Sequence, residues 1–337
     1  MSLVPFLHRV VAGDSLSSEE AHQAMSVLLE GGATEAHIAG FLVALKIKGE
    51  TAAELAGFAR AMREKMTPVD AGPDVIDTAG TGGDGAGTFN ISTVAAIVMA
   101  GAGARVAKHG NRSLSSICGS ADLLEALGVR IAMSAEEAAW AVREIGIGFL
   151  FAPALHPSMK YAQSVRRDLK LRTAFNLLGP LANPAGARFQ LIGAPSQHAA
   201  GLMAQALAEL GTTRSFVVHG EDGLDEVSTT SPTQVREVTP SSVRTHLWTP
   251  ADFGVPGATL DALAGGDAAR NAQITREILA GTRSPARDVV LVNAAAGLLA
   301  AGLATGLPQG VALAARAIDS GAAREKLEAL QKRFPAS

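Results

Sequence analysis

The sequence predicts an α/β protein: a small N-terminal helical domain over residues 1–68, followed by a larger α/β domain whose mostly parallel central sheet is flanked by helices. The first 66 residues carry helix-capping patterns, whereas short apolar runs alternate with Ala- and Leu-rich stretches after residue 68. That alternation is typical of βα units. With 337 residues, the chain is long enough for two packed bodies.

Three helices are predicted in the first 66 residues. Capping-box patterns begin two of them, at Ser17 and Thr51, because each hydroxyl is followed three residues later by a glutamate that can satisfy the opposite backbone N–H. Between them, Thr34 begins a helix that Gly49 ends. One face of that helix is apolar and is expected to be buried: Ile38, Phe41, Leu42 and Leu45.

The larger domain is marked by strand-like apolar runs at 75–76, 148–151, 189–192, 216–218 and 289–292, with helical stretches at 94–100, 121–127 and 199–210. A polar, basic stretch interrupts this rhythm. We expect a helical segment over about 158–178 that folds back on the helical domain. The α/β domain then comprises residues 69–157 and 179–337.

No charged residue occurs between Asp288 and Arg316, so this stretch has to be tested as a membrane span. Asn293, Pro308 and several glycines interrupt it. It is better explained as the strand 289–292, a helix over 294–303, a turn and a second helix. No association with a membrane is expected.

Composition excludes several classes of protein. The 29 Lys and Arg residues nearly balance 32 Asp and Glu, giving a net charge of −3, which disfavours a dedicated nucleic-acid binder. The single cysteine, Cys118, excludes an internal disulfide and a multi-thiolate zinc site. Because the N-terminus also lacks the pattern of a secretory signal, a cytoplasmic location is expected.

A glycine cluster follows the first predicted strand, at 80–87, and leads into a helix that begins near residue 90. A glycine loop between strand and helix lets backbone N–H groups approach an anion, and the helix N-terminus favours negative charge. The pattern is neither the dinucleotide fingerprint nor a Walker loop. The alternative is a tight turn without a ligand, because Gly adopts positive φ readily.

A second cluster, KHGNRSLSS at 108–116, brings two cations, an amide and three hydroxyls together after the run Arg105–Ala107. Such a density of donors suits a multiply charged phosphate ester, and a solvated basic loop is the alternative.

A third cluster, GLDE at 223–226, follows the predicted strand 216–218. Adjacent carboxylates at the end of a strand suit magnesium, which prefers hard oxygen ligands. An isolated pair of this kind is more often a solvated face. The two phosphate-type loops elsewhere in the chain favour the magnesium interpretation.

Together these loops resemble those of the anthranilate phosphoribosyltransferases. The strings that carry the resemblance extend over nearly the whole chain: GTGGD (80–84), NIST (90–93), KHGNRSLSS (108–116), GSADLLEALG (119–128), HPSMK (156–160), RTAFNLLGPLANP (172–184), GLDE (223–226) and NAAA (293–296). The family's reaction transfers the phosphoribosyl group of phosphoribosyl diphosphate (PRPP) to anthranilate, in tryptophan biosynthesis. The resemblance implies this activity for the chain.

The resemblance also implies the site residues. PRPP is expected to contact Gly80, Gly83, Asp84, Thr88, Asn90, Ile91, Ser92, Thr93, Lys108, His109, Gly110, Asn111, Arg112, Ser113, Ser115, Ser116 and Ser120. Anthranilate is expected to contact Gly80, Asn111 and Arg166, the last through its carboxylate. Magnesium, two ions per subunit, is expected at Ser92, Asp225 and Glu226, and the catalytic residues are Lys108, Asp225 and Glu226.

A hinge between the two domains and a homodimer formed through the helical domain are implied in the same way. Two other functions remain open. A pyrimidine nucleoside phosphorylase shares the implied fold, but its glycine and lysine loops differ from those here. A non-catalytic, nucleic-acid-binding relative should be basic with damaged sites, and this chain is slightly acidic with its sites intact.

Overall fold

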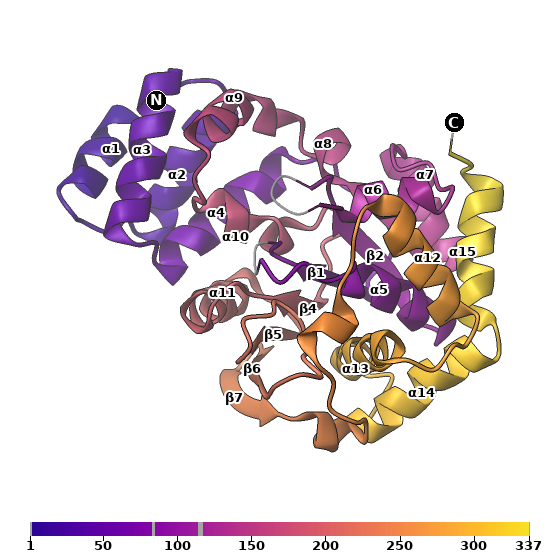
Figure 1. Cartoon of the computed structure of the whole chain (residues 1–337). Helices are drawn as coiled ribbons and strands as arrows, with labels where there is room; N and C mark the ends of the chain where they lie inside the picture. Colours follow the sequence, from indigo (N-terminus) through magenta and orange to yellow (C-terminus); the bar gives the residue numbers. More distant parts are fainter. Residues whose placement is uncertain (1, 83–84, 114–116, 337) are drawn as a thin grey trace.

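The computed structural model describes residues 2–82, 85–113 and 117–336 (Figure 1). The predicted site residues Gly83, Asp84, Ser115 and Ser116 therefore lie outside the described residues. At the N-terminus a helical bundle comprises α1 (Val4–Val11), α2 (Ser18–Leu29), α3 (Glu35–Lys48) and α4 (Ala52–Lys65). The first of these helices was not predicted, because no capping side chain precedes it.

The predicted helix boundaries in the bundle are confirmed. Ser17 and Thr51 each accept a hydrogen bond from the glutamate N–H three residues on, and both capping boxes are complete. Thr34 caps α3, and Gly49 ends it with a φ of 87°, a conformation that favours glycine. The Glu54 carboxylate is fully buried, and the cost of burying it is offset by hydrogen bonds that it accepts from the backbone N–H of Leu16, at 2.9 Å, and from Lys48 Nζ, at 3.0 Å.

In the described part of the chain the strands form one sheet in the order β3-β2-β1-β4-β5-β6-β7. They are β1 (Val75–Gly80), β2 (Arg105–Gly110), β3 (Ile147–Phe151), β4 (Phe189–Gly193), β5 (Arg214–Gly220), β6 (Thr233–Thr239) and β7 (Ser242–Trp248). The first five run parallel, whereas β6 and β7 form an antiparallel hairpin at one edge. The predicted, mostly parallel sheet is confirmed.

The order of the strands creates a switch point. The chain runs from β1 to β2 and β3 on one side, then crosses to β4 on the other side of β1. In open α/β sheets, ligands bind outside the carboxyl ends of the strands at such a point. The loops that follow β1, β2, β4 and β5 are therefore the ones to compare with the predicted site.

Two hydrophobic cores cover the two faces of the sheet. Neighbouring residues on one strand contribute to different cores, as Leu191 and Ile192 of β4 do, because successive side chains point to opposite faces. One core contains α5 (Ile91–Gly101), α13 (Pro285–Ala300), α14 (Leu307–Asp319) and α15 (Ala322–Arg333). The other contains α11 (Gln197–Leu210), which packs against α4 of the bundle.

The remaining elements are short or peripheral. The α-helices are α6 (Ser120–Ala126), α7 (Ala135–Trp140), α8 (Ala152–Leu155), α9 (Lys160–Leu169), α10 (Phe175–Leu178) and α12 (Ala268–Leu279). The η segments are η1 (Ala141–Ile145), η2 (Pro157–Met159), η3 (Pro180–Ala182), η4 (Pro250–Phe253) and η5 (Leu260–Leu263). Among them, α9 returns to the bundle and packs against α2 and α3 (Figure 1).

The predicted strand at 289–292 is wrong. These residues lie within the single helix α13, which Ser284 caps and Pro285 opens. Because α13 is buried on nearly all sides, its apolar run has neither a helical nor a strand period. Within the described part of the chain, no helix combines the length and apolar character needed to cross a membrane.

Candidate active site

The glycine loop lies at the carboxyl end of β1, beside the switch point. Gly82, Gly85 and Gly87 all have positive φ, between 62° and 69°, which residues with a side chain rarely adopt. The chain then enters α5, whose first turn leaves backbone N–H groups without partners inside the helix. This is the strand, glycine loop and helix arrangement that the sequence predicts.

The acidic segment reaches this loop from β5. Asp225 and Glu226 are only 6% and 7% exposed, so the alternative of a solvated pair is wrong. Asp225 Oδ2 accepts from the N–H of Gly82 at 2.8 Å, and Glu226 Oε1 accepts from the N–H of Ser92 at 3.1 Å. The two carboxylates therefore connect the acidic segment to the glycine loop and to the start of α5.

Close backbone contacts fix the position of the acidic segment. A Cβ added at Gly193, the last residue of β4, would lie 1.5 Å from the carbonyl oxygen of Asp225, so only glycine fits there. From the other side, Asn293 of α13 accepts from the N–H of Val227 at 2.9 Å and donates to its carbonyl at 2.9 Å. Asn293 is fully buried, and sequence reasoning assigned no physical role to it.

The second cluster begins inside β2 rather than in a loop, since the strand extends to Gly110. Lys108 is 3% exposed, and its Nζ donates to the carbonyl of Thr78 on β1 at 2.7 Å. A solvated basic loop is therefore wrong for this residue. Burial lowers the pKa of Lys108, while the carboxylates of Asp77 and Glu226 oppose that shift by attraction.

His109 of β2 lies next to a second histidine, His156. The rings of His109 and His156 are 5.0 Å apart between centroids, and His109 Nδ1 lies 3.1 Å from the carbonyl oxygen of Gly179. Burial lowers the pKa of His109 to about 4 and that of His156 to about 3. Both rings are thus neutral at physiological pH, and such low pKa values make them weak proton acceptors.

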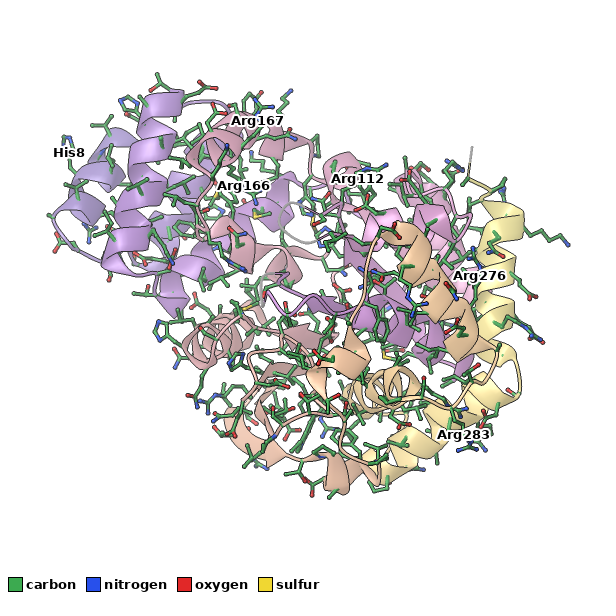
Figure 2. All side chains as sticks on the ribbon, viewed as in Figure 1. His8, Arg112, Arg166, Arg167, Arg276 and Arg283 are labelled. Carbon is green, nitrogen blue, oxygen red and sulfur yellow. The ribbon has the colours of Figure 1, made fainter. Side chains whose placement is uncertain are left out.

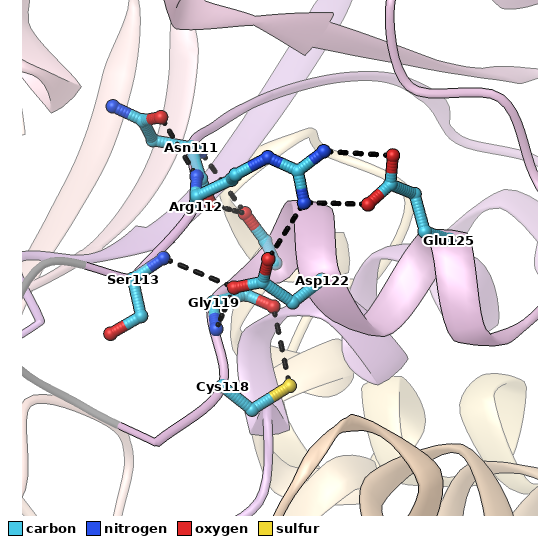
Figure 3. Close-up of polar contacts among 8 residues, drawn as sticks. Asn111, Arg112, Ser113, Cys118, Gly119, Asp122 and Glu125 are labelled. Atoms are coloured by element: carbon cyan, nitrogen blue, oxygen red, sulfur yellow. Dashed lines mark hydrogen bonds and ion pairs between the residues drawn. The ribbon is translucent and has the colours of Figure 1, made fainter.

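The segment after β2 is organised by Asp122 of α6 (Figure 3). Asp122 Oδ2 accepts from the N–H of Ser113, at 3.2 Å, and from that of Gly119, at 2.9 Å. The guanidinium of Arg112 bonds Asp122 Oδ1 at 2.9 Å and both oxygens of Glu125, at 2.6 and 2.8 Å. The predicted phosphate contact Arg112 is thus paired with carboxylates in this structure, and they raise its pKa.

Other predicted contacts have roles within the fold. The amide of Asn90 donates to the carbonyl of Cys118 at 3.0 Å and accepts from Asn271 at 2.9 Å. Thr88 forms an isolated bridge with Ala264. The buried residues Ile91 and Thr93 lie in the first turn of α5, and Ser120 Oγ donates to the carbonyl of Asn111 at 3.2 Å.

The structure distinguishes two adjacent arginines of α9 (Figure 2). Arg167 is exposed near the outer edge of the molecule, whereas Arg166 is half-buried and lies toward its interior. The Arg166 guanidinium lies 5.1 Å from the ring centroid of Phe175, and burial lowers its pKa. Only Arg166 is therefore oriented inward, as its expected role requires.

The oxygen-bearing residues fit magnesium. Asp225 and Glu226 supply carboxylate oxygens next to Ser92, and hard oxygens are what this ion prefers. Among the described residues, no group of three or more His, Cys, Asp or Glu side chains could hold a metal ion. An ion here therefore requires further oxygens from substrate phosphates or water, which is usual for magnesium.

The fold and the site define a glycosyl transferase built from two parts. A model described as "Glycosyl transferase family, helical bundle domain" matches residues 4–66, and one described as "Glycosyl transferase family, a/b domain" matches residues 72–324. The anthranilate phosphoribosyltransferase of Solibacter usitatus is 61% identical over 333 residues, which cover 98% of each chain. The chain thus belongs to the anthranilate phosphoribosyltransferase family.

Solved structures agree. That of the Thermus thermophilus enzyme is 43% identical, with a TM-score of 0.92 over 98% of this chain and 99% of that one. The Saccharomyces cerevisiae enzyme in complex with PRPP and Mg is 29% identical, with a TM-score of 0.89 over 98% and 97%. The yeast enzyme was also solved with 4-fluoroanthranilate, with a TM-score of 0.88 over 98% and 96%.

Proposed function

We propose that this protein transfers the 5-phosphoribosyl group of PRPP to the amine of anthranilate, giving N-(5-phosphoribosyl)anthranilate and diphosphate. This reaction belongs to tryptophan biosynthesis. The observation that carries the proposal is the meeting of the glycine loop, the start of α5 and the pair Asp225 and Glu226, in a member of this family. Such a site provides backbone donors and oxygen ligands for a diphosphate.

In this proposal, PRPP lies across the carboxyl ends of β1 and β2. The backbone of 80–82 and the first turn of α5, including Ser92, bind the diphosphate, and residues 108–113 with Ser120 bind the rest of the molecule. Support comes from the switch point of the sheet and from the positive φ values of the loop glycines. Gly80, Asn111 and Arg166 bind anthranilate, with Arg166 pairing with its carboxylate.

The chemistry follows from the two substrates. The amine of anthranilate is weakly basic because its lone pair is delocalised into the ring, so removing a proton first gains little. The barrier lies in breaking the bond between C1 and diphosphate. Lys108 stabilises the negative charge that grows on the leaving group, and positioning of the amine on the opposite face gives inversion at C1.

Magnesium, when bound, supplies further stabilisation of the diphosphate. We assign two ions per subunit, to Ser92 and to the pair Asp225 and Glu226. The support is the donor chemistry of these residues and the solved structure of the yeast enzyme in complex with PRPP and Mg. Counting bound magnesium by equilibrium dialysis with PRPP present tests the number.

The proposed reaction is tested by mixing protein, PRPP, magnesium and anthranilate and following the loss of anthranilate fluorescence. Loss that requires all four components is expected. No loss, with or without metal, would overturn the proposal. Phosphorolysis of uridine and a salt-dependent gel shift on single-stranded DNA test the two alternative functions, and neither activity is expected.

A homodimer formed through the helical domain is part of the proposal, as is a cytoplasmic location. Support for the dimer comes from two large apolar side chains that are exposed on the bundle, Val11 of α1 at 68% and Ile47 of α3 at 82%. Apolar groups on neighbouring helices suit burial against a second copy. Sedimentation should give a dimer mass, and Ile47→Glu should shift the protein toward monomer.

A further inference from the structure

The two central strands of the sheet separate at the end that carries the site. Pairing of β1 with β2 covers two positions, Val75 with Arg105 and Ile76 with Val106. By contrast, β1 pairs with β4 through Gly80, and β2 pairs with β3 through Gly110. Both strands therefore continue to their carboxyl ends, but without pairing to one another.

The side chain of Asp77 occupies this separation. Its Oδ1 accepts from the backbone N–H of His109 on β2, at 3.1 Å, and its Oδ2 accepts from the amide of Asn183, at 2.8 Å. Asp77 is 1% exposed. The carboxylate thus takes a position where a parallel pair of strands would otherwise bond backbone to backbone.

Asn183 completes the arrangement from outside the sheet. It follows η3, and its Nδ2 donates both to Asp77 and to the carbonyl of Ala107 on β2, at 2.9 Å. Its Oδ1 accepts from the N–H of Ala185 at 2.8 Å, so every polar atom of this buried side chain is used. One amide therefore connects a carboxylate of β1 with the backbone of β2.

Burying a carboxylate inside a sheet is costly, and an apolar residue at position 77 would avoid that cost. Burial does raise the pKa of Asp77, although Lys108, Asn183 and the backbone oppose the shift. A buried carboxylate inside β1, on the side of the strand that leads to the site, is therefore explained by the geometry that it imposes. The two loops whose separation it sets are those that begin at Thr81 and Asn111.

We propose that Asp77 and Asn183 are positioning residues, which hold the carboxyl ends of β1 and β2 apart and so set the spacing of the two loops that grip PRPP. This inference rests on the proposed function. The pair contacts the strands rather than the substrate, so it acts through Lys108, His109 and the loop backbone. Its loss should weaken PRPP binding more than anthranilate binding, because Arg166 of α9 lies outside the two loops and still pairs with the carboxylate of anthranilate.

Three variants test the pair. Asn183→Ser keeps a short acceptor for the turn at Ala185 but removes both donations. Asp77→Asn keeps an oxygen that accepts from the N–H of His109. Its new NH₂ group, however, faces the NH₂ group of Asn183, so two donors meet. The double variant Asp77→Asn with Asn183→Asp restores a donor facing an acceptor between the two side chains, while the donation to the carbonyl of Ala107 stays lost. Ser215→Ala is the control, because it removes a buried hydrogen bond, 2.6 Å to Thr212, at the amino end of β5.

Two measurements apply to every variant: steady-state KM for each substrate, and titration calorimetry with PRPP and magnesium in the absence of anthranilate. Each single variant should raise the KM and the Kd for PRPP about tenfold or more, with a clearly smaller rise in the KM for anthranilate. The double variant should recover part of the loss, and Ser215→Ala should behave as the wild type does.

Several results would overturn the inference. Single variants with an unchanged PRPP KM, or equal rises in both KM values, would each do so. If all three variants fail to fold while Ser215→Ala folds, the pair serves stability alone. A wild-type protein without turnover would instead refute the proposed function itself, and this inference with it.

Discussion

Acidification should destabilise this protein through two buried histidines. The unfolded chain protonates each imidazole near pH 6.5, whereas in the folded state His109 does so at about pH 4 and His156 at about pH 3. Between these values the unfolded state binds more protons, so stability is present above about pH 6.5 and is lost as the pH falls. From pH 7 to pH 5 the loss is about 2 kcal/mol for each histidine.

This loss is a large fraction of the ~5–15 kcal/mol by which domains are typically stable. Urea unfolding at pH 7 and pH 5 measures it for the wild type and for His109→Gln and His156→Gln. Each variant should lose about 2 kcal/mol less than the wild type over that interval. The exposed residue His8 provides the control substitution His8→Gln (Figure 2). If both buried variants lose as much stability as the wild type, the assignment of neutral buried rings is wrong.

The other predictions concern the substrates. Arg166→Ala should raise the KM for anthranilate far more than that for PRPP, with Arg167→Ala as the exposed control; equal rises would refute the carboxylate contact. Asp225→Asn combined with Glu226→Gln should lower activity steeply and shift the magnesium concentration that gives the half-maximal rate. If the magnesium requirement is unchanged, the two carboxylates serve only the structure of the protein. Asn293→Ala should lower the free energy of unfolding by about 2 kcal/mol, since two backbone groups lose their partner. The same variant should weaken magnesium-dependent PRPP binding in calorimetry. If it loses stability alone, Asn293 has no role in the site.

Local signals predicted much of the fold. The caps at Ser17, Thr34 and Thr51 are decided by contacts within four residues, so sequence spacing is sufficient to find them. The hairpin of β6 and β7 was missed because its residues are polar and half-exposed at a sheet edge, and such strands lack an apolar run. The error at α13 has the opposite cause, since an all-round buried helix resembles a strand in composition.

The candidate site was predictable where chemistry is concentrated in one segment. The glycine loop and the pair Asp225 and Glu226 could be found because each is a short, unusual string. Asp77 and Asn183 could not, because they lie 106 positions apart in the sequence and only the folded sheet brings them together. A charged residue within the apolar run 75–79 was the available signal, and the motif around Asn183 was recognised without a physical role.

The core that α4 shares with α11 has a thermodynamic consequence. Apolar side chains of the bundle, of α11 and of β4 and β5 form one continuous cluster, so the bundle cannot melt without uncovering a face of the sheet. Heating should therefore give a single calorimetric transition rather than one for each domain. Residues 69–337 produced alone would present the apolar face of α11 to water and should self-associate. The two family domains are thus expected to unfold together, as one cooperative unit.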